Sequence, residues 1–317
     1  MTEAWSRKVG RGLTGRVASG DGVVYTGGYD RRVVAVSLET GAVRWTRRLP
    51  GPISAGLIRH GGALYVGTDR PDDKVYALDA ATGQRLWRRQ VGGAGPLALV
   101  HGLVMVTSRR GEAFGLDPRT GAIRWRQRVG VSRSPAVAAD SGTLLLATID
   151  SLFLIRSRDG EILARARAPS PVVSDWVPLG GELVAGTGDS TVIAVDGRTL
   201  AITWRARLDA PVFATPVVRG DTLIAVTRVG GIWRFRRGVP EPPERLARLG
   251  WPVTTSPTPF GDLLLVGGAD GGIRAVRSDG TEAWRMALSP PIEIPPLPLP
   301  DGLVGFGGRG ELRRYRL

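Results

Sequence analysis

Four ionisable residues stand in segments that otherwise consist of small, hydroxyl-bearing, proline or apolar residues. They are Arg16, Arg133, Asp175 and Glu293. Two carboxylates about 5–10 Å apart can act as a general acid and a general base, and a nearby arginine can hold an anionic substrate. Paired charges that fill a hydrated channel are the simpler interpretation, because buried charges in proteins are usually paired. The residues alone leave both interpretations open, and we assign no catalytic residue.

Two tryptophans stand close to these segments and outside the repeating pattern described below. Trp176 follows Asp175 directly, and Trp251 lies in the short sequence Gly250-Trp251-Pro252. An exposed tryptophan in a loop is a typical anchor of a protein interface. We therefore treat both as candidate ligand or partner contacts, with core packing as the alternative for each.

Residues that could bind a metal ion are few and dispersed. The chain has no cysteine, and its two histidines, His60 and His101, each precede a glycine in equivalent turns. A zinc site needs three or four converging ligands, so we interpret both histidines as turn residues. The loop 68–74 is rich in aspartate, but it lacks the glycine-punctuated spacing of a calcium loop, and we interpret it as a solvated acidic loop. We expect no metal site and no cofactor site.

The elements that position these residues repeat along the chain. The pattern is an apolar strand, Ala-Val/Leu-Asp, a Thr-Gly turn and then Trp, and it is clearest at Ala77, Asp79, Thr82, Gly83 and Trp87. The tryptophans of the pattern are Trp5, Trp45, Trp87, Trp125, Trp204 and Trp284. Ala164 and Arg245 occupy two further positions of the same series. A period near 40 residues with several short strands per unit is typical of a β-propeller blade.

The period predicts an all-β, eight-bladed β-propeller with four antiparallel strands in each blade, because 317 residues hold about eight such units. The chain opens with a lone strand of the Trp type, residues 4–9, and its last unit lacks one. We therefore expect the N-terminal strand to complete the last blade and close the ring, which also removes exposed sheet edges. We expect residues 1–317 to form a single domain.

The charge of the chain is strongly positive, with a formal net charge of +14. In the Trp-type strands, the positions one and three residues after Trp share one face of the sheet. Eleven of these sixteen positions are basic and none is acidic: Lys8, Arg48, Arg88, Arg126, Arg128, Arg165, Arg167, Arg205, Arg207, Arg248 and Arg285. If this strand is outermost, these side chains form a basic belt around the rim. Such a belt is either a solvated surface or a contact for an anionic partner.

Composition also bears on the source and location of the protein. Asn is absent and nearly all basic residues are arginine, which is typical of a GC-rich bacterial genome. The first residues contain no apolar signal core, and no stretch is apolar and long enough to span a membrane. We expect a cytoplasmic protein as numbered, or a periplasmic or secreted one if a signal peptide was removed.

The phrase from Ala77 to Trp87, and its close copy from Leu116 to Trp125, resembles the tryptophan-docking motif of the pyrroloquinoline-quinone-like propeller repeat. The resemblance extends over essentially the whole chain. It implies that each tryptophan packs against the neighbouring blade. The family includes quinoprotein dehydrogenases, sensor domains of bacterial kinases and non-catalytic scaffolds, among them the propeller lipoprotein of the outer-membrane β-barrel assembly machinery.

The chain departs from the enzymes of that family at the residues that hold their cofactor. Those enzymes carry a vicinal cysteine pair and calcium ligands that include asparagine, and neither residue type occurs here. The chain is similar to the assembly scaffold in length and blade number, but it has neither the signal peptide nor the lipid-bearing cysteine of that protein. The resemblance therefore favours a scaffold over a quinoprotein enzyme.

We expect a non-enzymatic scaffold that binds a protein partner through one loop face and the basic rim. In one form of this hypothesis the partner is acidic. The first alternative is a small-molecule or sugar-processing enzyme that uses Asp175, Glu293 and an arginine at the channel mouth. The second is binding of nucleic acid without sequence specificity through the arginine belt, by contacts to phosphates.

Overall fold

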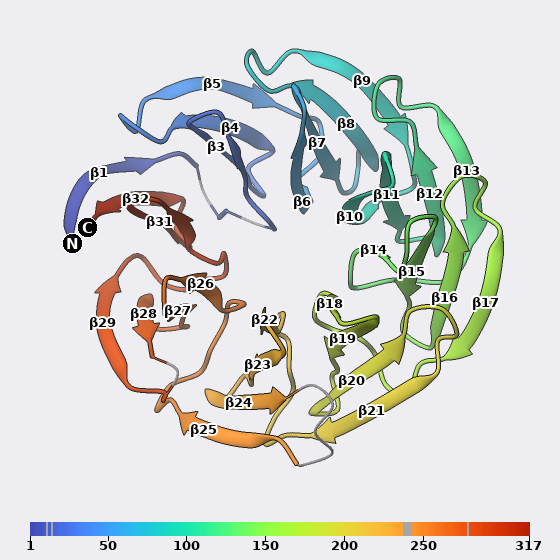
Figure 1. Ribbon diagram of the computed structural model, residues 1–317. Helices are drawn as coiled ribbons and strands as arrows, with labels where there is room; N and C mark the ends of the chain where they lie inside the picture. The colour runs from blue at the N-terminus through green and yellow to red at the C-terminus, as the bar shows by residue number, and fades with distance from the viewer. Residues whose placement is uncertain (11, 14, 237–241, 278) are drawn as a thin grey trace.

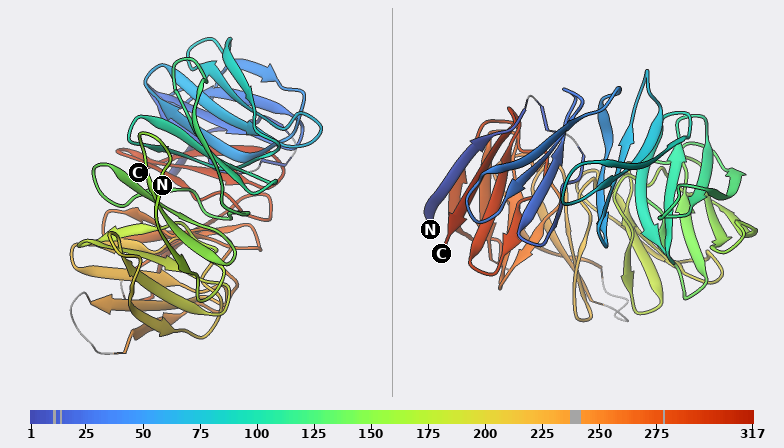
Figure 2. Two further views of the ribbon diagram at one scale, coloured as in Figure 1. Left: turned by 90° about the vertical axis from the view of Figure 1, so that its right-hand side faces the viewer. Right: turned by 90° about the horizontal axis from the view of Figure 1, so that it is seen from above.

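The computed structural model describes residues 1–10, 12, 13, 15–236, 242–277 and 279–317. Eight four-stranded antiparallel sheets surround a central axis in the order of the chain (Figure 1). Viewed from the side, they form a thick disc (Figure 2). The described residues contain no helix. The expected eight-bladed β-propeller is confirmed.

Each blade has a short inner strand, two middle strands and an outer strand. The strands of blades 1–4, from the axis outward in each blade, are β2 (Ala18–Gly20), β3 (Val23–Gly27), β4 (Arg32–Ser37) and β5 (Val43–Arg48); β6 (Ile53–His60), β7 (Ala63–Thr68), β8 (Lys74–Asp79) and β9 (Arg85–Gln90); β10 (Ala94–Val100), β11 (Leu103–Ser108), β12 (Glu112–Leu116) and β13 (Ile123–Arg128); β14 (Val137–Ala138), β15 (Thr143–Ala147), β16 (Ser151–Arg156) and β17 (Ile162–Arg167).

Blades 5–8 follow the same scheme. Their strands are β18 (Val177–Leu179), β19 (Glu182–Gly186), β20 (Thr191–Asp196) and β21 (Ile202–Arg207); β22 (Val217–Arg219), β23 (Thr222–Val226), β24 (Gly231–Arg236) and β25 (Glu244–Arg248); β26 (Thr258–Phe260), β27 (Leu263–Gly267), β28 (Gly272–Val276) and β29 (Glu282–Ala287); β30 (Leu297–Leu299), β31 (Gly302–Gly307), β32 (Glu311–Arg316) and β1 (Thr2–Lys8).

The N-terminal strand closes the ring as expected, although it covers residues 2–8 rather than 4–9. β1 pairs antiparallel with β32, from Thr2 opposite Arg316 to Lys8 opposite Glu311. The two ends of the chain consequently lie side by side at the rim of blade 8 (Figure 1). Closure through a sheet gives the first and last units a hydrogen-bonded junction instead of two free edges.

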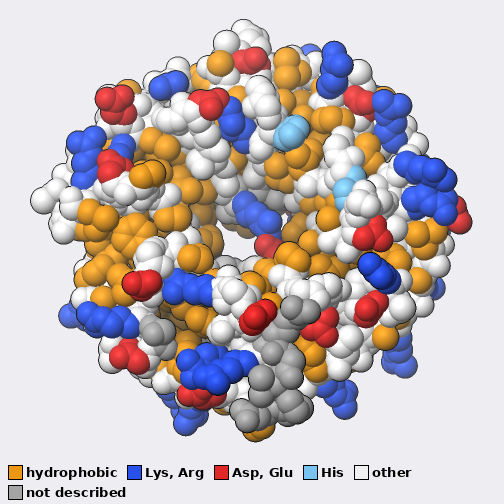
Figure 3. All heavy atoms as spheres, viewed as in Figure 1, with side chains coloured by type: hydrophobic (Ala, Val, Ile, Leu, Met, Phe, Trp, Pro, Cys, Tyr) orange, Lys and Arg blue, Asp and Glu red, His pale blue; other side chains and the backbone are white. Residues whose placement is uncertain are grey.

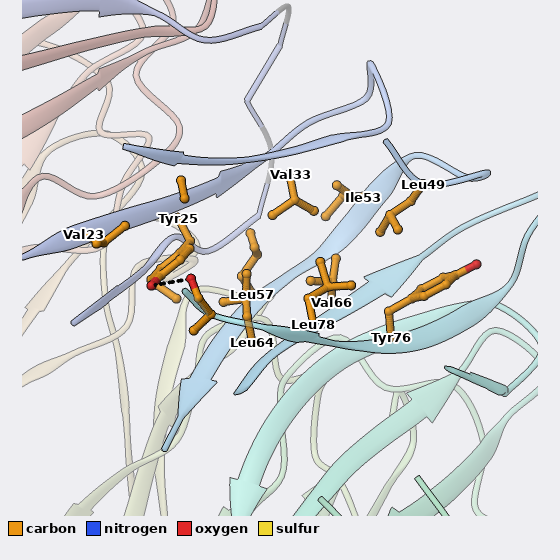
Figure 4. Packing of buried hydrophobic residues seen from close by; sticks show 13 residues of the cluster. Val23, Tyr25, Val33, Leu49, Ile53, Leu57, Leu64, Val66, Tyr76 and Leu78 are labelled. Atoms are coloured by element: carbon orange, nitrogen blue, oxygen red, sulfur yellow. Dashed lines mark hydrogen bonds between the residues drawn. The ribbon is translucent and has the colours of Figure 1, made fainter. Parts of the chain in front are cut away.

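The hydrophobic core lies between blades rather than inside any one of them. The middle strands are buried almost throughout, because each is covered by a neighbouring blade on both faces, and they are correspondingly apolar along their length. Figure 4 shows one such cluster, in which Val23 and Tyr25 of blade 1 meet Leu64 and Leu78 of blade 2. The Tyr25 hydroxyl donates to the carbonyl of Ala80 in the next blade at 3.0 Å.

The tryptophans of four outer strands dock on the next blade. The indole N–H groups of Trp5, Trp45, Trp87 and Trp125 donate to the carbonyls of Leu38, Ala80, Pro118 and Ser157, at 2.7–3.0 Å. Each acceptor opens the turn between the third and fourth strands of that blade. The glycine of the same turn lies flat on the indole. A Cβ added to Gly83, for example, would come 2.6 Å from the Trp45 ring.

The contacts change in the other half of the ring. At the junction of blades 4 and 5 the outer-strand position is Ala164, and the turn that faces it carries Leu200 where the turns of blades 1–4 and 7 carry glycine. Leu200 keeps the left-handed backbone of those glycines (φ 62°) and is buried in the same cluster that Ala164 packs against. A small residue opposite a large one therefore replaces the Trp–Gly pair at similar volume.

Candidate functional site

The central channel contains the largest group of sequence-predicted site residues. A cavity of about 720 Å³ opens there between blades 5–8 and the first segment of blade 1, and it is lined by Arg16, Asp175 and Glu293. Arg16 and Asp175 come from blades 1 and 5, which face each other across the ring, and they form an ion pair. Figure 3 shows basic and acidic side chains inside the central hole. The pair therefore bridges the channel.

This ion pair bears on the acid–base hypothesis. Asp175 is bound by a guanidinium, and its backbone N–H donates to the Thr215 hydroxyl at 3.3 Å. The Asp175 carboxylate is thus already occupied by a partner within the protein. Glu293 is exposed on the wall of the same cavity. The arrangement favours paired charges that fill the channel over a pair of catalytic carboxylates.

Hydroxyl groups on the channel wall link adjacent blades. The Thr215 backbone N–H donates to the Ser256 hydroxyl at 2.9 Å, and the Thr254 hydroxyl donates to the carbonyl of Ile292. With the bond from Asp175 to Thr215, these contacts connect the inner segments of blades 5, 6, 7 and 8. The Ser and Thr residues of the inner segments thus satisfy backbone groups near the axis.

Arg133 and the two unusual tryptophans lie elsewhere. Arg133 is exposed in the inner segment of blade 4, outside the lining of this cavity. Trp176 is only 4% exposed and packs in the core between blades 4 and 5, so it is a core residue and not a surface contact. Trp251 is half-buried, and the guanidinium of Arg274 lies 4.0 Å from its ring centre.

Arg274 organises the region around Trp251. It is buried on β28 and binds the carboxylate of Asp270 in the preceding turn, with a further contact of 3.5 Å to Glu282. The hydrogen bond from Arg274 lowers the pKa of Asp270 to about 2, and the Gly272 backbone N–H adds to this effect. Asp270 is thus a structural carboxylate, as its place in a turn suggested.

The acidic loop 68–74 also has a structural role. The Asp72 carboxylate is buried and accepts hydrogen bonds from Thr68 at 2.9 Å and from Tyr76 at 2.7 Å, and it forms an ion pair with Lys74. Burial alone would raise the pKa of Asp72, but these partners lower it. Within the part of the chain that the structure describes, no three or more His, Asp or Glu side chains are grouped to hold a metal ion.

The basic belt is present on the outer strands. All eleven of its side chains are exposed, including Arg205 and Arg207 on β21. Among described carboxylates, only Glu112 and Glu282 pair with members of the belt, namely Arg126 and Arg285. Figure 3 shows basic side chains spaced around the circumference. The rim therefore presents cations that the fold itself does not neutralise.

Three residues that contribute to these regions were not identified from the sequence. Trp233 on β24, outside the Trp series, lies opposite Arg245, and the Arg245 guanidinium is 5.8 Å from its ring centre. Phe213 is exposed on the channel wall, and Arg228 lies 5.7 Å from its ring centre. Leu200 fills the place of a glycine. Only Leu200 had a signal in the sequence, since it follows Thr199 where the repeat expects Gly.

The repeat pattern also matches a known family model. The PQQ_2 family, described as outer membrane protein assembly factor BamB, matches residues 2–134, 71–162, 109–233 and 157–289. These segments together cover most of the chain. The chain belongs to this family.

Individual relatives are distant. Residues of this BamB-family chain are 27% identical to BamB of Yersinia pestis over 264 residues, which is 74% of this chain and 64% of that protein. They are 27% identical to BamB of Xanthomonas campestris over 182 residues, 51% of this chain and 44% of that protein. The chain thus spans less than two thirds of the length of these relatives. The crystal structure of BamB from Moraxella catarrhalis superposes over 100% of this chain and 99% of that one, with a TM-score of 0.81 and 17% identity.

The residues present do not fit the quinone cofactor that gives the wider repeat family its name. The resemblance described above implies a cysteine pair and asparagine among its ligands, and the chain has neither. In the central cavity Asp175 is already bound by Arg16.

Proposed function

We propose that this BamB-family propeller is a non-enzymatic scaffold that binds a protein partner during the assembly of outer-membrane proteins. The observation that carries the proposal is the family match, which covers residues 2–289. The partner surface in this proposal consists of one loop face and the basic belt.

The geometry supports a scaffold in two ways. The repeated Trp, Thr and Gly residues are engaged in docking blade on blade, and the carboxylate of Asp175 is engaged by Arg16. The belt, in contrast, presents charge outward. Cations on the rim of a protein interface mainly raise the association rate and select partners of opposite charge. An acidic surface on the partner therefore fits this propeller best.

The proposal places the protein in the cell envelope. The comparisons give no support to the cytoplasmic location that the numbered chain suggested. The described part of the chain contains no helix with the length and hydropathy needed to cross a membrane.

The experiment is a gene deletion in the bacterium that encodes the protein. Folded outer-membrane proteins are quantified by their heat-dependent mobility on gels. We expect their amount to fall in the deletion strain and to recover when the wild-type gene is restored. An Arg205→Glu/Arg207→Glu variant should recover less, because it replaces two belt cations by anions.

The matched control is Arg205→Lys/Arg207→Lys, which keeps both charges and should restore assembly almost fully. Unchanged levels of outer-membrane proteins in the deletion strain would overturn the proposal. Equal rescue by the Glu and Lys variants would remove the belt from the partner surface.

The exposed belt also favours a second candidate function, binding of nucleic acid through phosphate contacts. Its affinity for a fluorescent oligonucleotide should fall steeply with salt, because each neutralised phosphate releases counterions. Fluorescence anisotropy with single-stranded and duplex DNA tests this. Undetectable binding at about 50 mM salt would exclude it.

A further inference from the structure

The junction of blades 7 and 8 differs from the others because of the way the ring closes. In blades 1–4 a turn joins the third strand to the outer strand, and the tryptophan of the preceding blade docks on that turn. In blade 8 the corresponding strands are β32 and β1, which come from opposite ends of residues 1–317. Within these residues no turn connects the two strands, and Trp284 of blade 7 faces no described glycine turn.

The environment of Trp284 reflects this difference. Its ring is half-buried and meets Phe260 of its own blade edge-on, at 6.3 Å between ring centres and 89°. Among the described residues, its indole N–H has no hydrogen-bond acceptor. The four tryptophans that dock on described glycine turns all have one, at 2.7–3.0 Å. Trp284 packs in the cluster that contains Leu303 and Tyr315 of blade 8, but it stays partly exposed and lacks the carbonyl partner of the docked tryptophans.

A groove of about 850 Å³ lies beside this indole, and we name it the Trp284 groove. Its apolar lining includes Phe260, Leu263 and Trp284 of blade 7, and Pro298, Leu299 and Leu317 of blade 8. The groove opens on the face that carries the two histidines (Figure 3). Hydrophobic side chains gather at the left of that view, over the region that β26–β29 and β31–β32 occupy in Figure 1. An exposed apolar groove of this kind on a soluble surface often marks an interaction site.

The edges of the groove are polar and held in place. From blade 6, the Arg219 guanidinium donates to the carbonyls of Gly261 and Leu263, at 3.1 and 2.8 Å, and so fixes the turn that forms one wall. Arg277 also lines the groove and is exposed. Its guanidinium contacts the Thr281 hydroxyl at 3.2 Å and forms no ion pair within 4 Å with a described carboxylate. Hydrogen bonds from Thr281 lower the pKa of Asp279, and the charge of Arg277 adds to this effect. One wall of the groove is therefore fixed by Arg219, and Asp262 and Arg277 are the charged side chains of its lining.

We propose that the Trp284 groove binds a tight turn of a partner protein, in which a glycine covers the indole and a backbone carbonyl accepts its N–H. The turns of blades 1–4 show how an indole in this position is covered. The turns of blades 2, 3 and 5 also contain an aspartate that accepts from the turn backbone, as Asp117 accepts from the N–H of Thr120 at 3.0 Å. We expect an aspartate of a partner turn to pair with Arg277, which lines the groove. The inference rests on the proposed function in so far as it assumes a protein partner.

The first test uses a cyclised hairpin peptide with the sequence of residues 76–86 of this chain, labelled with a fluorophore. We expect it to bind the full-length protein and to lose about tenfold or more in affinity when the glycine of the peptide is replaced by leucine. Trp284→Ala in the protein should cause a similar loss. Tyr29→Ala, which truncates an exposed aromatic side chain outside both cavities, is the matched control and should bind as wild type.

A second variant gives an independent result if Trp284→Ala does not fold. Arg277→Glu changes an exposed side chain, and it should weaken binding of the aspartate-containing peptide and strengthen binding of a peptide with lysine in its place. Absence of binding to any peptide, or binding that neither Trp284 nor Arg277 variants change, would overturn the inference. Self-association of the wild type that Trp284→Ala abolishes would show that a second copy occupies the groove instead.

Different experimental outcomes would contradict this inference and the proposed function. If Trp284→Ala and Arg277→Glu restore outer-membrane protein assembly as well as wild type while the belt variant does not, the groove is not the partner site but the scaffold role holds. If the gene deletion has no effect while the peptide binds as described, the groove is a turn-binding site with a different biological role.

Discussion

Glycine has a steric role in the Thr-Gly turns that goes beyond turn formation. Gly83 has a φ of 71°, and a Cβ added there would lie 2.6 Å from the Trp45 ring. Gly61 also has a positive φ, 56°, but a Cβ there would meet nothing within 4 Å. A comparison of alanine substitutions at Gly83 and Gly61 therefore separates the cost of backbone strain from the cost of contact with the indole.

We expect Gly83→Ala to lower the free energy of unfolding by about 2–4 kcal/mol, since it combines left-handed strain with overpacking. Gly61→Ala should cost only the strain, about 1–2 kcal/mol. Urea unfolding followed by circular dichroism measures both. Equal losses for the two variants would show that the indole contact adds nothing.

The Asp270–Arg274 pair makes stability depend on pH. The pKa of Asp270 is lowered to about 2 in the folded protein, against an unfolded value near 3.9. A carboxyl whose folded pKa is depressed contributes stability that is complete above the unfolded pKa and is lost as pH falls through the folded pKa. This contribution should therefore disappear between about pH 4 and pH 2.

We expect the free energy of unfolding of Asp270→Asn to fall less steeply than that of the wild type between pH 5 and pH 3. The variant should also be less stable than the wild type at pH 7, because buried Arg274 loses its main charged partner. Urea unfolding at the three pH values provides the comparison. Parallel pH profiles for the two proteins would contradict the assignment.

At the scale of the strand and turn, Ala164 and Leu200 behave as a matched pair. Ala164→Trp alone should destabilise the protein by about 1–3 kcal/mol, since Leu200 occupies the space of the indole. Leu200→Gly alone should cost about 2–4 kcal/mol through the cavity it leaves. The double variant restores the Trp–Gly combination found at Trp87 and Gly121. Its loss in free energy of unfolding should therefore be smaller than the sum of the two single losses by more than about 1 kcal/mol.

A double-mutant cycle in urea measures this coupling. Ile202→Ala, at an exposed position of the next outer strand, serves as a control that should add to Ala164→Trp without coupling. Additive losses in the Ala164/Leu200 cycle would show that the two residues do not share one space.

Much at this scale was predictable, because the repeat fixes local geometry. The blade count, the outer position of the Trp strands and the exposed belt all follow from a period near 40 residues and a two-residue alternation. The long-range contacts were not predictable in the same way. The Trp204 indole N–H donates to Glu182 of its own blade at 3.1 Å and to no described residue of the next blade, and the spacing of the repeat does not predict this change. The Arg16–Asp175 pair depends on the diameter of the ring, and the Trp284 groove depends on which turn is missing.

At the scale of the whole molecule, we propose that residues 1–317 unfold as one domain. Every blade shares its core with its neighbours, and β1 joins the two ends of the array. Thermal unfolding followed by far-ultraviolet circular dichroism and by tryptophan fluorescence should give a single, coincident transition. Trp5→Ala should lower its midpoint without splitting it. Separate transitions for the two probes would indicate two independent units.

The unequal junctions have a consequence for how such a ring can change over evolutionary time. The docking contacts of Trp45, Trp87 and Trp125 share one chemistry, so a blade duplicated or recombined within blades 1–4 meets a compatible neighbour. A blade inserted between blades 4 and 5 meets no compatible neighbour. The indole of the inserted blade would have no space beside Leu200, and its turn glycine would leave a void beside Ala164. Gene rearrangements that alter blade number should therefore be tolerated on one side of the ring and rejected on the other.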